Sequence, residues 1–527
     1  MREKPRRLYS ALLMIASGTR ALIRQRLADE TGRIEKDAPF RVALAYPSPY
    51  RVGMSSLGYQ RIYRALQAMP GVACERAFLP DGAEEPRPCD VEMPVTYESL
   101  RPLVDFQVVA LSVAYELELA GVVRLLDAAK IPLLSRERSD ESPFILAGGP
   151  LTFSNPLPLA PFVDAIIIGE AEGIVEWAIE VLRSGLRRSA ALDALAKHPH
   201  IFVPAVHGRV LPPVAACDDA LLPAYGAIRT PNTELSNMFL IETERGCSRG
   251  CTYCVMRRST NGGMRVVPKD VILDIIPADA RRVGLVGAAV SDHPKIVEIL
   301  RALAARGAEV GLSSLRPDRL KDEFVEALRL AGYRTLTTAL DGASERLRGL
   351  IERRGREPHY VAAAERARRY GMNRLKLYLM LGLPGETMDD IDECAKFVGE
   401  ISKVLPVALG VAPFCAKRKT PLDGTAFAGI DEVEAHIARL RSGLRGRADV
   451  RAVSARWAWV EYALAQGDDE EGLALSRAVR AGGRFTDYRR EFGELGYALR
   501  GPTLPRIFPP STVPKIPTTS RLPVITA

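Results

Sequence analysis

The chain has 527 residues, 47% of them hydrophobic and 26% charged, which is an ordinary globular composition with room for about three domains. The net charge is +8, but basic and acidic residues alternate along almost the whole sequence, which argues against a nucleic-acid-binding protein. No apolar stretch has the length of a membrane span, and the 8 cysteines lack the paired spacing of a disulfide framework, so we expect a cytoplasmic protein.

Residues 1–38 form a basic N-terminal segment that contains one short apolar stretch. Its pattern predicts an amphipathic helix packed on the body of the protein. A peripheral contact with an anionic membrane is the alternative interpretation of the same pattern.

Residues 39–185 alternate between buried strands and helices, with strands expected at 41–47, 108–113, 144–149 and 164–169. This order predicts an α/β fold, a doubly wound Rossmann-like domain with a parallel sheet. Ligands of such sheets bind beyond the carboxyl ends of the strands, where glycine lets the backbone approach them closely. The candidate ligand-binding residues in these loops are Gly53, Ser55, Gly58, Ser112, Tyr115, Gly148, Gly149, Gly169 and Glu170.

Residues 186–235 are rich in alanine and proline and are predicted to be a linker with a few short elements. Three histidines lie here, His198, His200 and His207. No cysteine or carboxylate pattern accompanies them, so we expect histidines that face solvent and no metal site.

Three cysteines, Cys247, Cys251 and Cys254, follow a short apolar run at 237–241 with the spacing CxxxCxxC. Three thiolates on one glycine-containing loop suit iron-sulfur clusters and zinc, because both prefer soft sulfur ligands. A structural zinc site needs four ligands, and no CxxC or HxxxH pair stands nearby to complete one. The pattern therefore favours an iron-sulfur cluster with one open iron, and a reduced structural cysteine cluster is the alternative.

This stretch closely resembles the cluster motif of the radical SAM superfamily, in which Tyr253 matches the aromatic residue before the third cysteine. The resemblance implies a 4Fe-4S cluster on the three cysteines, whose open iron holds S-adenosylmethionine (SAM). It also implies reductive cleavage of SAM to a 5′-deoxyadenosyl radical.

Residues 236–425 continue the strand and helix alternation and, by this resemblance, form a partial (β/α)6 barrel. The family's GGE-type turn reads Gly287-Ala288-Ala289 here, which departs from the motif. The residues that the resemblance makes candidate SAM contacts are Gly287, Ala288, Ser313, Arg316, Asp341 and Ser344, together with Tyr253. Local capping or surface ion pairing is the alternative for Asp341 and Ser344.

Asp292 and His293 follow the same strand end and are candidates for acid-base catalysis, with a capped helix start as the alternative. Cys415, after the sixth strand, is a third candidate catalytic residue, and a half-buried thiol is its alternative.

The segment GLPGET at 382–387 is a second motif that matches the family, in which it packs against the adenine of SAM. Its candidate cofactor contacts are Gly382, Pro384, Gly385 and Glu386. Beyond the barrel, residues 426–500 are predicted to be a small, mostly helical region, and residues 501–527 a proline-rich flexible tail.

The loops of residues 39–185 are similar to those of the cobalamin-binding Rossmann domain that precedes the barrel in one branch of the superfamily. The loop after the first strand lacks the DxHxxG sequence, so no histidine is offered to cobalt. The resemblance implies three cofactors, the 4Fe-4S cluster, SAM and cobalamin, and methylation of an unactivated carbon.

Two alternatives remain open: a cobalamin-independent radical SAM enzyme that modifies RNA or catalyses a rearrangement, and a non-catalytic iron-sulfur or corrinoid-binding protein. The expected partners are an unidentified small-molecule or peptide substrate and an electron donor such as flavodoxin or ferredoxin.

Overall fold

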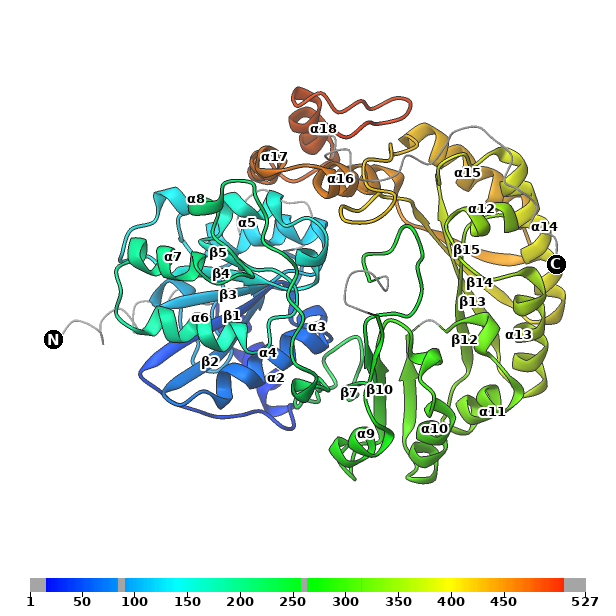
Figure 1. The fold of residues 1–527 in the computed structure, drawn as a ribbon, viewed down its shortest axis with the longest axis horizontal. Coiled ribbons are helices and arrows are strands. Elements are labelled where there is room, and N and C mark those ends of the chain that lie inside the picture. Colours follow the sequence, from blue (N-terminus) through cyan, green and yellow to red (C-terminus); the bar gives the residue numbers. More distant parts are fainter. Residues whose placement is uncertain (1–15, 84–90, 257–262, 314, 507–527) are drawn as a thin grey trace.

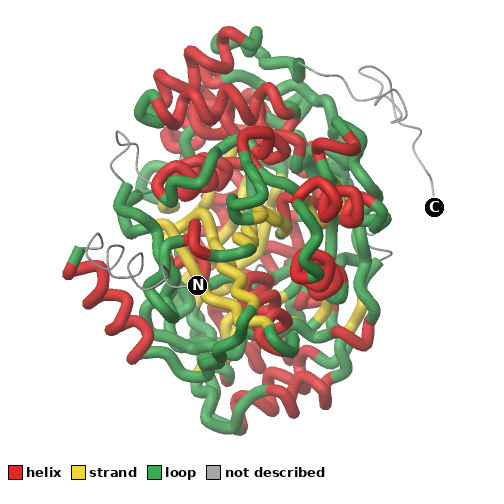
Figure 2. The backbone as a smooth tube through the Cα atoms, turned by 90° about the vertical axis from the view of Figure 1, so that its left-hand side faces the viewer, coloured by secondary structure: helices red, strands yellow, loops and turns green. Residues whose placement is uncertain are grey.

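The computed structural model describes residues 16–83, 91–256, 263–313 and 315–506. Two α/β units lie side by side, and the C-terminal helices run across both of them (Figure 1). The strands occupy the interior of the molecule and the helices form much of its outer surface (Figure 2). The expected fold class is therefore confirmed.

The N-terminal unit is built on one sheet with the strand order β2-β1-β3-β4-β5-β6. All its pairs are parallel except that of β5 with β6. The strands are β1 (Phe40–Pro49), β2 (Val72–Leu79), β3 (Val108–Ser112), β4 (Phe144–Gly148), β5 (Ala165–Ile167) and β6 (Ile201–Phe202). The strand order reverses between β1 and β3, which is the place where doubly wound sheets bind ligands.

Helices cover both faces of this sheet because successive side chains of a strand point to opposite faces. Ala43 and Ala45 of β1 belong to the core shared with α5, whereas Val42 and Leu44 belong to the core shared with α4. The helices of the unit are α2 (Ser17–Ala28), α3 (Tyr50–Gly53), α4 (Leu57–Ala68), α5 (Leu119–Ala128), α6 (Ile174–Arg183), α7 (Arg188–Ala196) and α8 (Pro204–His207).

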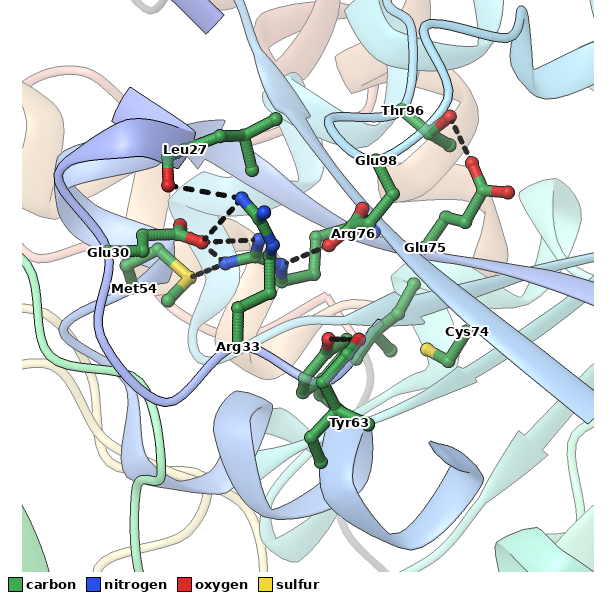
Figure 3. A network of polar contacts seen from close by, with 12 residues as sticks. Leu27, Glu30, Arg33, Met54, Tyr63, Cys74, Glu75, Arg76, Thr96 and Glu98 are labelled. Atoms are coloured by element: carbon green, nitrogen blue, oxygen red, sulfur yellow. Dashed lines mark hydrogen bonds and ion pairs between the residues drawn. The ribbon is translucent and has the colours of Figure 1, made fainter. Parts of the chain in front are cut away.

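Strand β2 was not expected from the sequence, because Glu75 and Arg76 interrupt its apolar pattern. Both residues are buried and both charges are paired. Figure 3 shows Arg76 between Glu30 and Glu98, and Glu75 beside Thr96. The Arg76 guanidinium lies 2.7 and 2.8 Å from the two Glu30 carboxylate oxygens, and its Nε lies 2.7 Å from Glu98. Glu75 accepts hydrogen bonds from Thr96 and Ser99 and is paired with Arg41. Compensation of the charges is what allows this strand to be fully buried.

The expected N-terminal helix lies partly outside the described residues, which begin at residue 16. Helix α2 buries only Ile23. Glu30, just after α2, is buried against Arg76, so this ion pair anchors the N-terminal segment to the sheet.

The linker region 186–235 contributes more to the fold than expected, because β6 adds an antiparallel strand to the first sheet. The imidazole of His198 packs against Trp177, and Nδ1 of His200 lies 2.9 Å from the Pro213 carbonyl oxygen. The three histidines are half-buried rather than solvent-facing, and in the described part of the chain they belong to no metal site.

The second unit is a curved row of parallel strands in the order β7-β10-β11 and then β12-β13-β14-β15. A parallel bridge between Leu315 and Thr338 joins the two groups. The strands are β7 (Phe239–Glu242), β10 (Arg282–Val286), β11 (Glu309–Leu312), β12 (Thr335–Asp341), β13 (Arg374–Leu381), β14 (Val407–Pro413) and β15 (Ala448–Ala452). The expected six strands are present, and β15 extends the sheet into the region 426–500 that was expected to be mostly helical.

The outer face of this partial barrel is covered by helices that alternate with the strands (Figure 1). These helices are α9 (Lys269–Ile275), α10 (Ile296–Ala305), α11 (Asp322–Leu330), α12 (Glu345–Leu350), α13 (Glu357–Arg369), α14 (Met388–Val404) and α15 (Ile430–Gly443). Strand β13 shows the alternation clearly: Leu375, Leu377 and Leu379 are buried, whereas Lys376 is half-buried and Tyr378 is 40% exposed. The inner face of the barrel is therefore open at this strand.

Three helices follow the barrel, α16 (Ala455–Gln466), α17 (Asp469–Arg480) and α18 (Phe485–Glu494). Helices α16 and α17 contact the N-terminal unit, and α18 packs on both of them. The buried side-chain amide of Asn155 donates to the carbonyl oxygens of Leu464, Ala465 and Gly467 at the end of α16. Arg480 of α17 forms two hydrogen bonds with Asp127 of α5, at 2.7 and 2.9 Å.

The start of the expected flexible tail is packed, because Thr503 is buried and exchanges backbone hydrogen bonds with Phe427. Arg506 is paired with Asp468 and Glu471. Residues 507–527 lie outside the described residues. None of the helices described here combines the length and apolar character needed to cross a bilayer.

Candidate functional site

The three motif cysteines lie on a loop whose base is closed by two short antiparallel strands, β8 (Glu244–Arg245) and β9 (Arg265–Val266). The loop follows β7 and so begins at the carboxyl end of a barrel strand. It is tied to the barrel through the Thr252 amide, which donates to the carbonyl oxygen of Ile351 at 3.1 Å. This arrangement holds the thiols at the mouth of the barrel.

Burial raises the pKa of all three thiols, and it raises that of Cys254 to about 11. All three are free, and an Arg316 guanidinium nitrogen lies 3.5 Å from the Cys247 sulfur, where it favours the thiolate. Among the described residues no three His, Cys, Asp or Glu side chains are placed to hold a single metal ion. A four-iron cluster binds each cysteine through a different iron, so this donor set fits such a cluster without converging on one point.

A cavity of about 390 Å³ opens between the strand ends of the two units. It brings together residues that the sequence analysis selected in two separate regions, namely Gly58, Ser112, Gly148, Gly149, Gly169 and Glu170 of the first unit and Gly287 and Ala288 of the barrel. Gly246, which precedes the first cysteine, also lines it. The cavity is thus shared by the cluster loop and the carboxyl edge of the first sheet.

Three expected residues of the first unit do not line this cavity. Gly53 packs against the ring of Phe78, and the Ser55 hydroxyl donates to the Arg51 carbonyl oxygen. Tyr115 borders a different cavity, beside Trp457 and Tyr488 of the C-terminal helices.

Two cavity glycines are required by the backbone itself. Gly149 and Gly169 have φ values of +110° and +97°, and a side-chain carbon at either residue would lie 2.5 Å from backbone atoms of Val113 or Ala215. Both loops therefore keep their shape only with glycine.

Glu170 joins the two units and is not a free ligand for a cofactor. Its carboxylate lies 3.3 Å from Arg245, is hydrogen-bonded by Arg265, and accepts the Cys217 amide hydrogen at 2.8 Å. Burial raises the pKa of Glu170 and the hydrogen bond from Arg265 lowers it, with a net decrease. Arg245 also pairs with Glu172 at 2.9 Å and Glu242 at 2.7 Å. These contacts hold Arg245, two residues before Cys247, against the first unit.

The side chains of Asp292 and His293 both form contacts with neighbouring residues of the barrel. Asp292 is paired with Arg316 at 3.0 Å and with Arg319 at 3.1 Å. His293 is buried, with Nε2 2.9 Å from the Val267 carbonyl oxygen and Nδ1 accepting the Lys295 amide hydrogen. Burial lowers the pKa of His293, so the imidazole stays neutral. Both ring nitrogens of His293 are thus engaged in local hydrogen bonds, and an acid-base role of the two residues stays a prediction.

Other expected SAM contacts lie around the mouth of the barrel. The Ser313 hydroxyl is exposed and donates to the Gly287 carbonyl oxygen at 3.2 Å. Asp341 has a φ of +64° and pairs with Arg353 at 2.8 Å. Burial and the nearby Asp341 raise the pKa of Tyr253 well above its ordinary value, so its hydroxyl stays protonated.

Two expected cofactor contacts instead hold the local backbone together. The buried Ser344 hydroxyl accepts the Leu347 amide hydrogen at the start of α12 and donates to Asp390 at 2.5 Å. Glu386 accepts hydrogen bonds from the Gly382 amide at 2.7 Å and from Nδ1 of His436 at 2.8 Å.

The GLPGET turn itself depends on its glycines, because Gly382 and Gly385 have φ values of +83° and +72°. Pro384 is half-buried between them.

The surroundings of Cys415 keep its thiol protonated. Its sulfur donates to the Ala458 carbonyl oxygen at 3.2 Å, and burial raises the pKa of the thiol well above its ordinary value. These surroundings match the alternative of a half-buried thiol, and the catalytic role of Cys415 stays a prediction.

Sequence reasoning missed the acidic and basic residues that lead into the cluster loop, Glu242, Glu244 and Arg245. All three line the shared cavity. The available signal was the run Glu242-Thr243-Glu244-Arg245 directly after a buried strand, in a place where isolated charges are costly.

Known proteins and families match this chain in the same two regions. The model described as "Radical SAM proteins, N-terminal" matches residues 58–204, and that of the "Radical SAM superfamily" matches residues 241–398. The second range contains the three cysteines and the GLPGET turn.

Two curated relatives agree with these matches. The uncharacterized protein MJ0966 of Methanocaldococcus jannaschii is 26% identical over 73% of this chain and 80% of its own length. The ribosomal protein uS12 methylthiotransferase RimO of Leptospira biflexa is 26% identical over 36% of this chain and 44% of its own.

A solved structure of the cobalamin-dependent S-adenosylmethionine radical enzyme OxsB with aqua-cobalamin bound shares the fold, with a TM-score of 0.50 and 16% identity. The likeness covers 70% of this chain, which spans about half (53%) of OxsB. Because both family models match and the cysteine loop lies at the mouth of a partial barrel, the chain belongs to the radical SAM superfamily.

Proposed function

We propose that this radical SAM enzyme cleaves SAM reductively, at a 4Fe-4S cluster bound by Cys247, Cys251 and Cys254, to a 5′-deoxyadenosyl radical. The observation that carries the proposal is the loop of three free thiols, closed by β8 and β9, which borders the cavity between the two units through Gly246 and Met256. When bound, the cluster supplies the electron that breaks a carbon-sulfur bond of SAM.

The residues of this chain would bind and orient SAM and exclude water from it. Gly287, Ala288 and Ser313 lie at the turn after β10, and Tyr253 of the cluster loop lies near Asp341 and Arg353. The GLPGET turn, with Gly382, Pro384 and Gly385, would support the adenine end. Arg316 would hold Cys247 as a thiolate, because its guanidinium already contacts the sulfur.

We further propose that the first unit binds cobalamin and that the enzyme methylates an unactivated carbon. The glycine-lined cavity at the strand ends and the fold shared with a cobalamin-binding enzyme support this proposal. None of the described residues that line the cavity is a histidine, so cobalt would receive no imidazole from it. Methyl transfer would take place at the mouth of the barrel, where the cavity meets the cluster loop.

A cobalamin-independent reaction is the second candidate. The absence of histidine among the described residues that line the cavity favours it, as does the likeness to a methylthiotransferase. Whether the cavity holds cobalt decides between the two candidates.

An acidic one-electron donor, such as flavodoxin or ferredoxin, is the proposed partner. A surface depression beside Cys251 has more basic than acidic residues in its lining, with Arg249, Arg316, Arg353 and Arg354 against Asp318 and Glu352. Complementary charge would bring an acidic protein close to the cluster there.

The experiment is anaerobic purification with added cobalamin, cluster reconstitution, and measurement of iron, sulfide and cobalt per chain. The triple variant Cys247→Ala, Cys251→Ala and Cys254→Ala should lose the iron, about four atoms per chain, and all SAM cleavage. Cys394→Ala, which removes a buried thiol on α14, is the matched control and should keep both.

Iron and SAM cleavage that survive in the triple variant would refute the radical SAM assignment of the loop. Four irons with one cobalt would support cobalamin-dependent methylation. Four irons without cobalt would support the second candidate.

A further inference from the structure

We infer that Glu244 binds the α-ammonium group of SAM, in place of the glutamate that the GGE-type turn lacks in this chain. The inference rests on the proposed function and assigns a residue on β8, outside that turn.

The first observation is the position of the Glu244 side chain. It is fully buried and extends from β8 to the turn after β10. Its Oε1 accepts the Ala289 amide hydrogen at 2.6 Å. A side-chain carbon at Gly287 would lie 2.0 Å from the same oxygen, so the carboxylate fills the space above this glycine. A carboxylate thus reaches the turn from a neighbouring strand.

The second observation is that this carboxylate lacks a cation. Its Oε2 is buried and has no hydrogen-bond partner, and no basic side chain among the described residues pairs with it. Arg245, the adjacent residue, is turned toward Glu170, Glu172 and Glu242. Burial of an unpaired carboxylate is costly, so a cationic ligand that reaches Oε2 would be favoured.

The third observation is the chemistry around the same turn. The Gly287 carbonyl oxygen and the exposed Ser313 hydroxyl lie 3.2 Å apart beside it. An ammonium group has three N–H donors, and here a carboxylate, a carbonyl and a hydroxyl are available as acceptors. Glu244, Gly287 and Ala288 also line the cavity next to the cluster loop. A primary ammonium is therefore the ligand group that matches this set.

The test is the equilibrium affinity of the reconstituted, full-length enzyme for SAM and for an SAM analogue that lacks the α-amino group. Wild-type enzyme should bind SAM at least about tenfold more tightly than the analogue. Glu244→Gln should bind SAM about 10- to 100-fold more weakly and should bind the analogue with unchanged affinity. Glu298→Gln, on the exposed surface of α10, is the control and should match wild type for both ligands.

Equal weakening of both ligands in Glu244→Gln, or no weakening at all, would overturn the inference. If Glu244→Gln does not hold four irons, the inference is tested on the wild-type enzyme alone. Equal affinities of the wild-type enzyme for SAM and for the analogue would then refute the assignment. A failure of the proposed function gives a different result from a failure of this inference. In that case the wild-type enzyme, with its cluster intact, would bind neither SAM nor the analogue.

Discussion

At the scale of single residues, the surroundings of Glu244 set its protonation. Burial raises its pKa, the hydrogen bond from the Ala289 amide lowers it, and Glu242 and Asp292 raise it further, to about 7. The carboxyl group is therefore partly protonated at neutral pH when no ligand is bound, and a bound cation would hold it ionised.

This pKa predicts how stability depends on pH. In the unfolded chain a glutamate has a pKa of about 4.3. Between pH 5 and 7 the folded protein therefore binds a proton that the unfolded chain has released. The contribution of Glu244 to the free energy of unfolding is present below pH 4.3 and is lost as pH rises through about 7. The loss is at most roughly 4 kcal/mol.

Urea unfolding of SAM-free wild type and Glu244→Gln between pH 5 and 8 measures this contribution. We expect the wild type to lose stability relative to the variant as pH rises. A difference between the two proteins that stays constant across this range would contradict the raised pKa.

At the scale of elements, the backbone of the GLPGET turn itself requires glycine. Gly382 has a φ of +83°, and a side-chain carbon there would lie 3.2 Å from Ala428 and Val433. The amide of Gly382 is also bonded to Glu386, which in turn pairs with His436 of α15. The turn therefore fixes the end of β13 against the next helices.

Gly382→Ala should reduce the free energy of unfolding by about 1–2 kcal/mol, because an L-residue is strained at this φ. Gly349→Ala is the matched control, since Gly349 lies in α12 with no other atom within 4 Å of the added carbon. The control should be neutral or stabilising by up to about 1 kcal/mol. Denaturant midpoints of both variants give the comparison, and equal effects would show that the backbone angle is not the cause.

At the scale of the whole molecule, the C-terminal helices connect the first unit to the barrel. The Asn155 amide donates to three carbonyl oxygens at the end of α16, and Lys417 pairs with Glu116 across the same junction at 2.7 Å. These contacts fix the two walls of the shared cavity relative to each other.

Asn155→Ala should lower the free energy of unfolding by about 2–4 kcal/mol, because it leaves buried carbonyl oxygens without a hydrogen-bond donor. It should also increase hydrogen exchange in α16 and α17. Asn232→Ala is the control, since Asn232 pairs with Asp29 at the surface and its loss should cost less than about 0.5 kcal/mol. Unchanged exchange in α16 and α17 of Asn155→Ala would show that this contact does not hold the units together.

Peripheral membrane contact through the N-terminal segment stays a prediction of the sequence. The apolar part of that segment, residues 11–15, lies outside the described residues. The substrate would be recognised by loops and C-terminal helices, which a single sequence does not place.

The sequence by itself determined the alternation of strands and helices, the cysteine loop and the glycines of the turns, because each depends on local pattern or backbone angle. Only the tertiary structure decided which charges are paired. In the fold, Glu75 and Arg76 lie in a buried strand and Glu170 pairs with Arg245. His293 is hydrogen-bonded to the backbone of Val267, and the Glu244 carboxylate lies against Gly287. The physical reason is that the environment of a charge depends on residues far away in the chain, which no local pattern contains.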